Sequence, residues 1–391
     1  MVSINFRLEQ AYCTPYKFVT MKQPTTFNPT TFPKFKPDTR EKHLRNLQRR
    51  INSRLKKEKE SAVNWIRLKT CIFPLIYAAL YFFTLAAYPL KIMFYLGYFS
   101  MGIFLVFIFL TVIHEVSHDN VFKSKSLNRF FLYFFDILGA NSFIWKRRHE
   151  VMHHNFPNMQ GWDTDIEQSS IFKIYPFAPH TRLHNHQHYL MFLLYPLYLF
   201  NWLLIRDFKD FFSAKSTIKK STYIPKKEFL KLIFFKSFYI FYMFAVPVFW
   251  FKIPFLSVLG GFLVLTFSAS IFALAVLLPP HANVENEFPL PDSDQQVETT
   301  WFEHQLRTTT DISNNNWFIS FFMGNFNYHV AHHLFPHLSY AHMKIATEEI
   351  AVYATENGFS YRQYPFFKAL HNHYLLVKQN AFHESILDET L

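Results

Sequence analysis

The sequence has few of the residues used for sulfur chemistry or for nucleotide-binding loops. Two cysteines, Cys13 and Cys71, occur in 391 residues, which allows neither a disulfide framework nor a Cys-based metal site or CxxC redox motif. Glycine is also scarce, with 8 residues, or about a third of the usual share of ~7%. None of them forms a GxGxxG or P-loop pattern, so no nicotinamide or nucleotide site is indicated.

Four long stretches are almost free of charge, and hydrophobic residues make up 50% of the chain. Each stretch has about 20 to 25 residues, and a helix of that length spans the ~30 Å hydrocarbon layer of a bilayer. A short turn joins the first to the second and the third to the fourth. We therefore expect four transmembrane helices in two hairpins, at Cys71–Leu90, Ile92–Ile113, Leu232–Phe251 and Pro254–Leu278.

Two other apolar segments are not expected to cross the membrane. Leu127–Ala140 is aromatic and amphipathic but too short to span, which favours an interfacial helix. Tyr189–Ile205 is slightly short and contains Pro196 and Asn201. A crossing there would place the histidine clusters described below on opposite sides of the membrane. If those clusters build one site, this segment must also lie in the interface.

The net charge is +12 at pH 7, which on a soluble protein would suggest nucleic acid. Much of the excess lies in Arg40–Lys59 and Lys215–Lys231, each shortly before an apolar run, whereas the turns at Lys91 and Lys252 carry one cation each. The positive-inside rule explains this distribution, so nucleic acid is not an expected partner. We expect a multi-pass membrane protein with both termini and the histidine clusters in the cytoplasm. The polar first 60 residues predict no cleavable signal peptide.

Histidines gather in three places with helical spacing. Residues three or four apart share one face of an α-helix, and imidazole is the commonest protein ligand for metals. One tetrahedral metal uses three or four ligands, so eight such histidines indicate two metals held by nitrogen. The clusters are His114 and His118; His149, His153 and His154; and His329, His332 and His333.

Nitrogen ligation without charge suits iron, zinc or copper. Removal of hydrogen from an unactivated methylene needs a strong oxidant, which two irons and O₂ can form and side-chain acids and bases cannot. Neutral ligands also leave the metal charge uncompensated, so carboxylates are expected to hydrogen-bond to the imidazoles from outside the site. The candidates in or near the clusters are Glu115, Asp119, Glu150, Asp163, Asp165, Glu285 and Asp311.

The three clusters resemble the histidine boxes of the integral-membrane fatty acid desaturase superfamily, which read HxxxH or HxxxxH, HxxHH or HxxxHH, and [HQ]xxHH. The run 327–336 is similar to the third box and the run 153–165 to the tract that follows the second. The resemblance covers roughly residues 65 to 350. It implies an O₂-dependent desaturase that introduces a double bond into an acyl chain at a centre of two irons. An external donor such as cytochrome b5 or a ferredoxin would supply electrons.

The same resemblance implies further site residues. His281, after Leu278-Pro279-Pro280, is expected to be the ninth metal ligand, and His304 to contact the ligands from outside. His329 stands where front-end members carry glutamine, and no cytochrome b5 domain is visible, which argues against a front-end enzyme. The acyl group could be carried by CoA, a carrier protein or a lipid. The cations that could hold a phosphate-bearing head group at the membrane surface are Lys146, Arg147, Arg148 and Arg307.

The expected fold class is an all-α membrane protein: four transmembrane helices in two hairpins, an interfacial helix, and a cytoplasmic helical cap carrying the histidine clusters. We expect a cytoplasmic N-terminal segment at residues 1–64, a membrane desaturase domain at 65–350 and a cytoplasmic tail at 351–391.

Three other functions compete. A hydroxylase or ketolase on the same scaffold would share the first hydrogen abstraction. His114–His118 and His149–His153 both match HExxH, the motif of zinc metalloproteases, although a protease needs neither two copies nor the third cluster. A metal transporter would carry histidines and acidic residues inside its spans, where this sequence has almost none.

Overall fold

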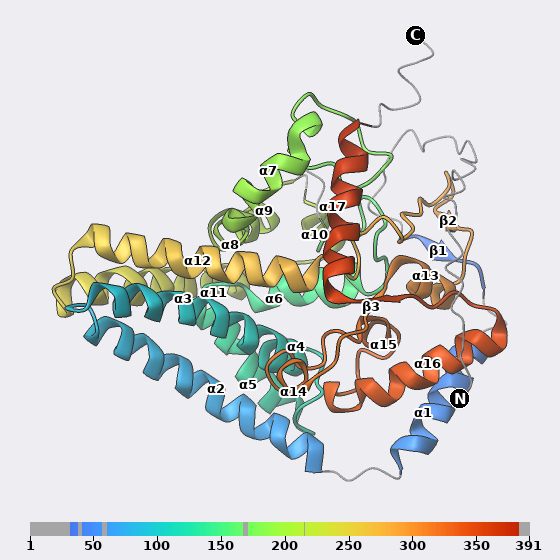
Figure 1. The fold of residues 1–391 in the computed structure, drawn as a ribbon, viewed down its shortest axis with the longest axis horizontal. Coiled ribbons are helices and arrows are strands. Elements are labelled where there is room, and N and C mark those ends of the chain that lie inside the picture. Colours follow the sequence, from blue (N-terminus) through green and yellow to red (C-terminus); the bar gives the residue numbers. More distant parts are fainter. Residues whose placement is uncertain (1–31, 38–40, 57–60, 167–170, 215, 383–391) are drawn as a thin grey trace, which may run out of the picture.

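The computed structural model describes residues 32–37, 41–56, 61–166, 171–214 and 216–382. Almost all regular structure in these ranges is helical (Figure 1). The expected all-α class therefore holds, apart from two parallel pairs of two-residue strands. The pairs are β1 (Lys34–Phe35) with β2 (Gln296–Val297), and β3 (Asp311–Ile312) with β4 (Gln363–Tyr364).

Four long helical rods run alongside one another and turn back at the same end (Figure 1). The second and fourth rods lie very close together at Gly102. A Cβ added to this glycine would be only 2.4 Å from the backbone oxygen of Leu265. A side chain at this position would force the two helices apart. The rods are α2 (Ser61–Ala86); α3 (Lys91–Ile108) with the π-helical turn η1 (Phe109–Ile113) and α4 (His114–Ser117); α11 (Lys226–Ile240) with η6 (Phe241–Trp250); and α12 (Phe255–Leu277).

In the described part of the chain, five helices are long and apolar enough to cross a membrane. This number and composition fit a multi-pass membrane protein. Four of the five correspond to the expected spans. The five are Val63–Ala86, Lys91–Ser117, His184–Ser221, Lys226–Trp250 and Phe255–Leu277.

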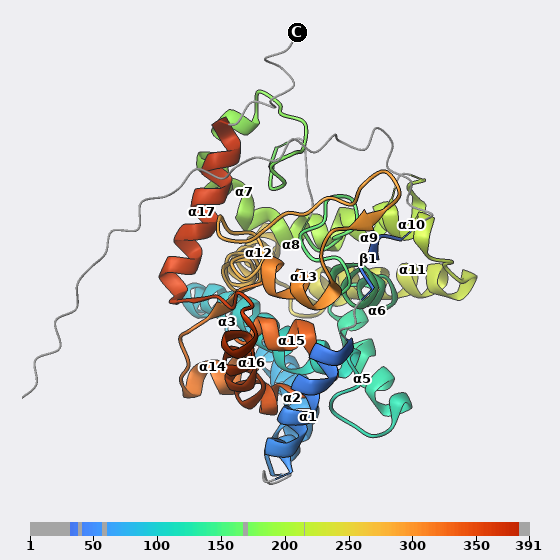
Figure 2. The same ribbon diagram turned by 90° about the vertical axis from the view of Figure 1, so that its right-hand side faces the viewer.

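The remaining candidate, His184–Ser221, differs from the other four in direction and regularity. It crosses α12 in Figure 1, and in Figure 2, where α12 is seen nearly end-on, it runs across the view. Pro196 lies in a 3₁₀ turn that interrupts it. Its outer side exposes Tyr189, Phe192 and Leu193. From Gln187 to Phe212 the segment comprises α7 (Gln187–Leu194), η4 (Tyr195–Leu197), α8 (Tyr198–Asn201), the π-helical η5 (Trp202–Arg206) and α9 (Asp207–Phe212).

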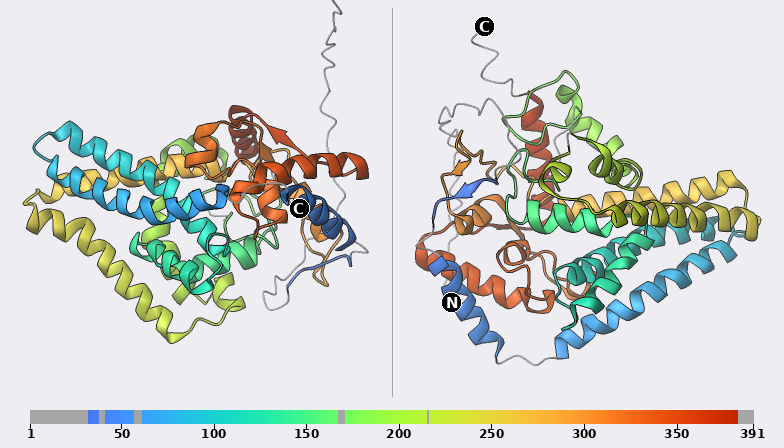
Figure 3. Two further views of the ribbon diagram at one scale, coloured as in Figure 1. Left: turned by 90° about the horizontal axis from the view of Figure 1, so that it is seen from below. Right: turned by 180° about the vertical axis from the view of Figure 1, so that it is seen from behind.

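A cap of shorter helices covers the end of the bundle opposite the turns, as the two views of Figure 3 show. The charged helix α1 (Glu41–Leu55) lies along α16 (Met343–Asn357), where Arg50 pairs with Glu356 at 2.6 Å and Arg54 with Glu348 at 2.7 Å. The expected boundaries at 64 and 350 fall within the helices α2 and α16. The other elements are α5 (Lys125–Ile137), α6 (Ser142–Lys146), η2 (Arg147–His153), η3 (His184–His186), α10 (Thr217–Ser221), α13 (Trp301–Thr308), α14 (Trp317–Phe322), α15 (His329–Leu334), η7 (Tyr340–His342) and α17 (Phe366–Phe382).

Candidate metal centre

The three histidine clusters and His281 meet where the cap joins the helical bundle. The first cluster lies on α4 and directly after it, the second on the π-helical η2 and directly after it, and the third on α15. His281 follows the end of α12. All nine side chains are buried, with at most 6% of their surface exposed. The fold thus brings together every histidine predicted to bind metal.

Four of these histidines form a first group. The group is His114, His118, His149 and His332, and each offers a ring nitrogen within 4.8 Å of one on every other member. Nε2 of His114 lies 3.1 Å from Nε2 of His149. Two nitrogens bound to one metal at 2.0–2.1 Å lie about 3 Å apart. The spacing therefore suits shared ligation.

Four other histidines form a second group with similarly close ring nitrogens. It consists of His153, His281, His329 and His333, again with ring nitrogens within 4.8 Å of one another. Nε2 of His281 lies 2.7 Å from Nε2 of His329. Two residues about fifty positions apart in the sequence therefore place their ring nitrogens next to each other.

His154 lies between the two groups. Its Nε2 is 3.2 Å from Nε2 of His149, and its ring centroid is 4.6 Å from those of His332 and His333. Its backbone N–H donates to the carbonyl of His149 at 2.9 Å, the i to i+5 bond of a π-helix. The wider π-turn brings residues five apart onto one side of the helix.

Three residues outside the groups hold imidazoles by their other nitrogen. Nδ1 of His149 donates to Asp165 at 2.8 Å, and Nδ1 of His153 donates to Asp163 at 3.0 Å. These contacts are the ones expected for these two carboxylates. Gln305, which nothing in the sequence pattern singled out, accepts from Nδ1 of His333 at 3.0 Å, and its Nε2 donates to the carbonyl of His154 at 3.0 Å. In each case the hydrogen bond directs Nε2 toward the centre.

The acidic residues within the first two clusters do not hydrogen-bond to the imidazoles as Asp163 and Asp165 do. Glu150 lies 3.9 Å from Nδ1 of His118, and Glu115 lies 4.0 Å from Nδ1 of His114, both beyond hydrogen-bond distance. Asp119 is exposed to solvent with a left-handed backbone (φ 61°). The prediction that Asp119 supports the imidazoles is therefore wrong, because its side chain lies outside the buried centre.

The loop and helix after α12 support the third cluster. Asp311 accepts from the backbone N–H of Val330 at 2.7 Å and from the hydroxyl of Tyr361 at 2.7 Å. It therefore fixes the start of α15 rather than an imidazole ring. The ring of His304 packs on Phe35 with centroids 5.0 Å apart, and the contact with a ligand that was expected of His304 is made by the next residue.

Burial keeps most of the imidazoles uncharged. It lowers the pKa of His149, although Asp165 offsets part of this effect, and it also opposes charge on His153, whose pKa is nevertheless raised because Asp163 outweighs burial. Neutral imidazole is the form that binds metal. Burial and the neighbouring imidazoles lower the pKa of five more well below the usual value: His154, His281, His329, His332 and His333.

A metal fits this donor set. Nε2 of His118, His332 and His333 is buried and has no hydrogen-bond partner within the described residues. Buried nitrogens without partners are costly and rare in folded proteins. Metal ions bound between the rings would satisfy them, and neutral imidazole ligands suit iron, zinc or copper.

The cations proposed to hold a head group divide into two classes. Lys146, Arg147 and Arg307 are partly or fully exposed. Arg148 is 1% exposed and pairs with Asp210 at 2.5 Å and with Asp207 at 3.2 Å. The prediction that Arg148 binds a head group is wrong, because its guanidinium is buried in the protein and taken up by two carboxylates.

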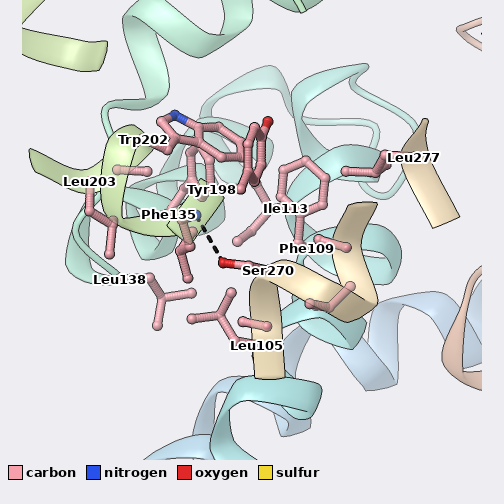
Figure 4. Close-up of a pocket in the computed structure, with 15 residues that line it drawn as sticks. Leu105, Phe109, Ile113, Phe135, Leu138, Tyr198, Trp202, Leu203, Ser270 and Leu277 are labelled. Atoms are coloured by element: carbon pink, nitrogen blue, oxygen red, sulfur yellow. Dashed lines mark hydrogen bonds between the residues drawn. The ribbon is translucent and has the colours of Figure 1, made fainter. Parts of the chain in front are cut away.

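An apolar pocket lies between α3, η1, α5, α8, η5 and α12 (Figure 4). It holds about 40 Å³ of free space. Ile113, which precedes His114, and Leu277 line one end, and Leu105 lies farther along α3. The hydroxyl of Ser270 accepts from the backbone N–H of Leu199 at 2.9 Å, which leaves the lining nearly free of available polar groups.

A profile of the family described as fatty acid desaturase matches residues 90–365. The chain belongs to the fatty acid desaturase family. Its enzymatic activity is accordingly that of an oxidoreductase that desaturates fatty acyl chains.

Characterised relatives agree with this family assignment. The chain is 28% identical to the sn-1 linoleoyl-lipid 6-desaturase of Synechocystis sp., over 77% of this chain and 84% of that protein. It is 26% identical to the enzyme of the same name from Arthrospira platensis, over 86% and 91%. It is 28% identical to the acyl-lipid (8-3)-desaturase of Physcomitrium patens, over 74% and 60%.

Proposed function

We propose that the nine histidines hold two iron ions and that O₂ is the co-substrate. His114, His118, His149 and His332 would bind one ion, and His153, His281, His329 and His333 the other, with His154 between them. Together with O₂, bound iron would supply the oxidant that removal of hydrogen from an unactivated methylene requires. The observation that carries this proposal is the convergence of buried ring nitrogens from four separate segments into two groups.

The surrounding residues would orient the ligands and keep water out. Asp163, Asp165 and Gln305 fix which ring nitrogen faces the centre. Trp145 stacks on His149 with centroids 5.0 Å apart and an interplanar angle of 12°. This buried indole separates the ligand from solvent, which strengthens the electrostatic interactions within the site.

The substrate we propose is an acyl chain carried on a membrane lipid. The names of the three relatives above all specify lipid-linked acyl chains, and the apolar lining of the pocket suits a short segment of a hydrocarbon chain. Binding in the pocket would hold the reacting carbons at a fixed distance from the head group and so set the double-bond position. The partly exposed Lys146 and the exposed Arg147 and Arg307 are proposed to contact the head group.

For the membrane arrangement we propose four spans, with the segment His184–Ser221 in the interface and with both termini and the metal centre in the cytoplasm. The steep angle between α7 and α12 supports the interfacial placement (Figure 1). Electrons would come from an external donor such as cytochrome b5 or a ferredoxin, which the basic cytoplasmic face could attract.

The zinc-protease alternative finds little support in the geometry. A HExxH zinc site needs both histidines of the motif on one metal. His149 and His153 fall in different groups of four histidines, although both also lie with Asp165 in a smaller group. The third cluster contributes ring nitrogens to both groups of four, and a protease would leave that cluster without a role.

Lipid profiling of a host that expresses the protein tests the proposed function. We expect new double bonds in lipid-linked acyl chains with the wild type. His332→Ala should abolish them while the protein still inserts in the membrane, and His186→Ala, a change at an exposed histidine, should not. New hydroxyl groups would instead indicate the hydroxylase alternative, and full activity of His332→Ala would contradict the ligand assignment.

A further inference from the structure

His281 is supported differently from the other eight histidines of the centre. Those eight lie in α4, η2 or α15 or directly follow one of these elements. His281 lies in a series of turns, and the preceding helix α12 ends at Leu277. A helix fixes its backbone by its own hydrogen bonds, whereas a turn needs other partners to hold a ligand in place.

Two asparagine side chains supply those partners. The carbonyl of His281 accepts from Nδ2 of Asn158 at 2.9 Å and from Nδ2 of Asn286 at 2.8 Å. The same Nδ2 of Asn158 also lies 3.2 Å from the carbonyl of Glu287 and 3.1 Å from that of Thr308. Asn158 therefore ties the turn that carries His281 to two further backbone segments.

The backbone of Asn158 is joined to a second ligand. Its N–H donates to Oδ2 of Asp163 at 2.8 Å. Oδ1 of the same carboxylate accepts from Nδ1 of His153 at 3.0 Å. One residue thus connects the carbonyl of His281 with the carboxylate that orients His153, and both histidines belong to the second group.

The residue type suits this position. Asn158 is fully buried and has a left-handed backbone with φ 58°, a conformation that asparagine tolerates better than most residues. Its amide offers two N–H donors to the surrounding carbonyls. An aspartate of the same shape would offer none and would place a negative charge beside three carbonyl oxygens.

We propose that Asn158 is a positioning residue. It fixes the position of His281 relative to His153 and so completes the second iron site. The proposal rests on the proposed function, because it requires two irons in the wild type. Loss of the Asn158 amide should release the turn that carries His281 and weaken the second site, while the first group keeps its ligands.

The test compares iron binding in four variants of the full-length protein purified in detergent. Asn158→Gly removes the amide and tolerates the positive φ, whereas Asn158→Asp keeps the shape and removes the donors. Asn286→Ala removes the other amide on the carbonyl of His281. The matched control is Gln187→Ala, since Gln187 is also a buried amide and bonds the backbones of Lys173 and Val377.

The readouts are iron atoms per chain, the ⁵⁷Fe Mössbauer spectrum and Tm. We expect about two irons in the wild type and the Gln187 variant, and a fall to about one in both Asn158 variants. Asn286→Ala should lose part of the same iron and alter the same Mössbauer component. The Gln187 variant should lower Tm without changing the spectrum.

Two irons and an unchanged spectrum in Asn158→Gly, with Tm lowered as in the Gln187 variant, would overturn the positioning role. If the Asn158 variants do not fold, Asn286→Ala decides: loss of iron supports the proposal, and an unchanged spectrum overturns it. A wild type with fewer than two irons would defeat the proposed function and this inference with it. That outcome is distinct from failure of the variants alone.

Discussion

Asp165 accepts a hydrogen bond of 2.8 Å from Nδ1 of His149, which leaves the Nε2 of that ring facing His114. Burial opposes charge on Asp165, but its contacts with His149 and His153 outweigh burial and hold its pKa well below the usual range. The carboxylate therefore stays ionised wherever the protein is folded, and it increases the basicity of a proposed ligand.

Replacement of Asp165 by asparagine should weaken metal binding with little change in shape. Partners of this kind typically contribute 10- to 100-fold in metal affinity, so we expect a loss of roughly that size for Asp165→Asn. Competition with a chelator measures it. Asp119→Asn is the matched control, because Asp119 is exposed and its positive φ suits asparagine. Equal affinities of the two variants would contradict the role of Asp165.

Acid should remove the metal and destabilise the protein together. Burial lowers the pKa of His154, His281 and His332, whereas histidines of the unfolded chain titrate near 6.5. Below that pH the unfolded chain binds more protons, so stability falls by up to about 1.4 kcal/mol per pH unit for each histidine kept neutral. Iron content and Tm should both drop below about pH 6. Retention of all iron at pH 5 would contradict this expectation.

Arg148 should matter for stability and not for recognition of a head group. Removal of its guanidinium in Arg148→Met leaves Asp207 and Asp210 with less compensation, at a cost of roughly 3–5 kcal/mol for a broken buried pair. Thermal unfolding measures this cost, and KM for the lipid should not change. Arg147→Ala, at an exposed neighbour, should change stability by less than about 0.5 kcal/mol. A raised KM with normal stability in Arg148→Met would instead support a role of Arg148 in binding the head group.

The apolar pocket predicts a change in chain-length preference. Ala273 lines it, and Ala273→Leu would fill free space at an overpacking cost of about 1–3 kcal/mol. Products with long acyl chains should decrease relative to shorter ones. Ala275→Leu, two residues along the same helix, serves as the control. Gas chromatography of the fatty acids compares the variants, and identical product distributions would show that this pocket does not hold the chain.

The sequence predicted which histidines meet but not how they divide. His114 and His118 are four apart and lie in one group, as α-helical spacing predicts. His149 and His153 are also four apart, yet they fall in different groups of four histidines and share only a smaller group with Asp165. They lie in η2, a π-helical turn in which His154 bonds to His149. The residue spacing alone does not reveal a change of helix type.

Roles that depend on distant partners were the hardest to predict. Gln305 is one polar residue in a polar helix, and its contacts with His333 and His154 arise only when α13, α15 and the second cluster pack together. Arg148 likewise looks like part of a basic surface run. Its true partners follow it by about sixty residues, and the sequence shows the charge but not the burial.

We propose that one chain holds two irons through histidine nitrogens alone. Metal analysis of the purified protein, combined with X-ray absorption at the iron edge, is the decisive experiment. We expect two irons per chain with a nitrogen-dominated ligand shell, and loss of iron in His332→Ala. A single metal per chain, or a ligand shell containing sulfur, would contradict the proposal.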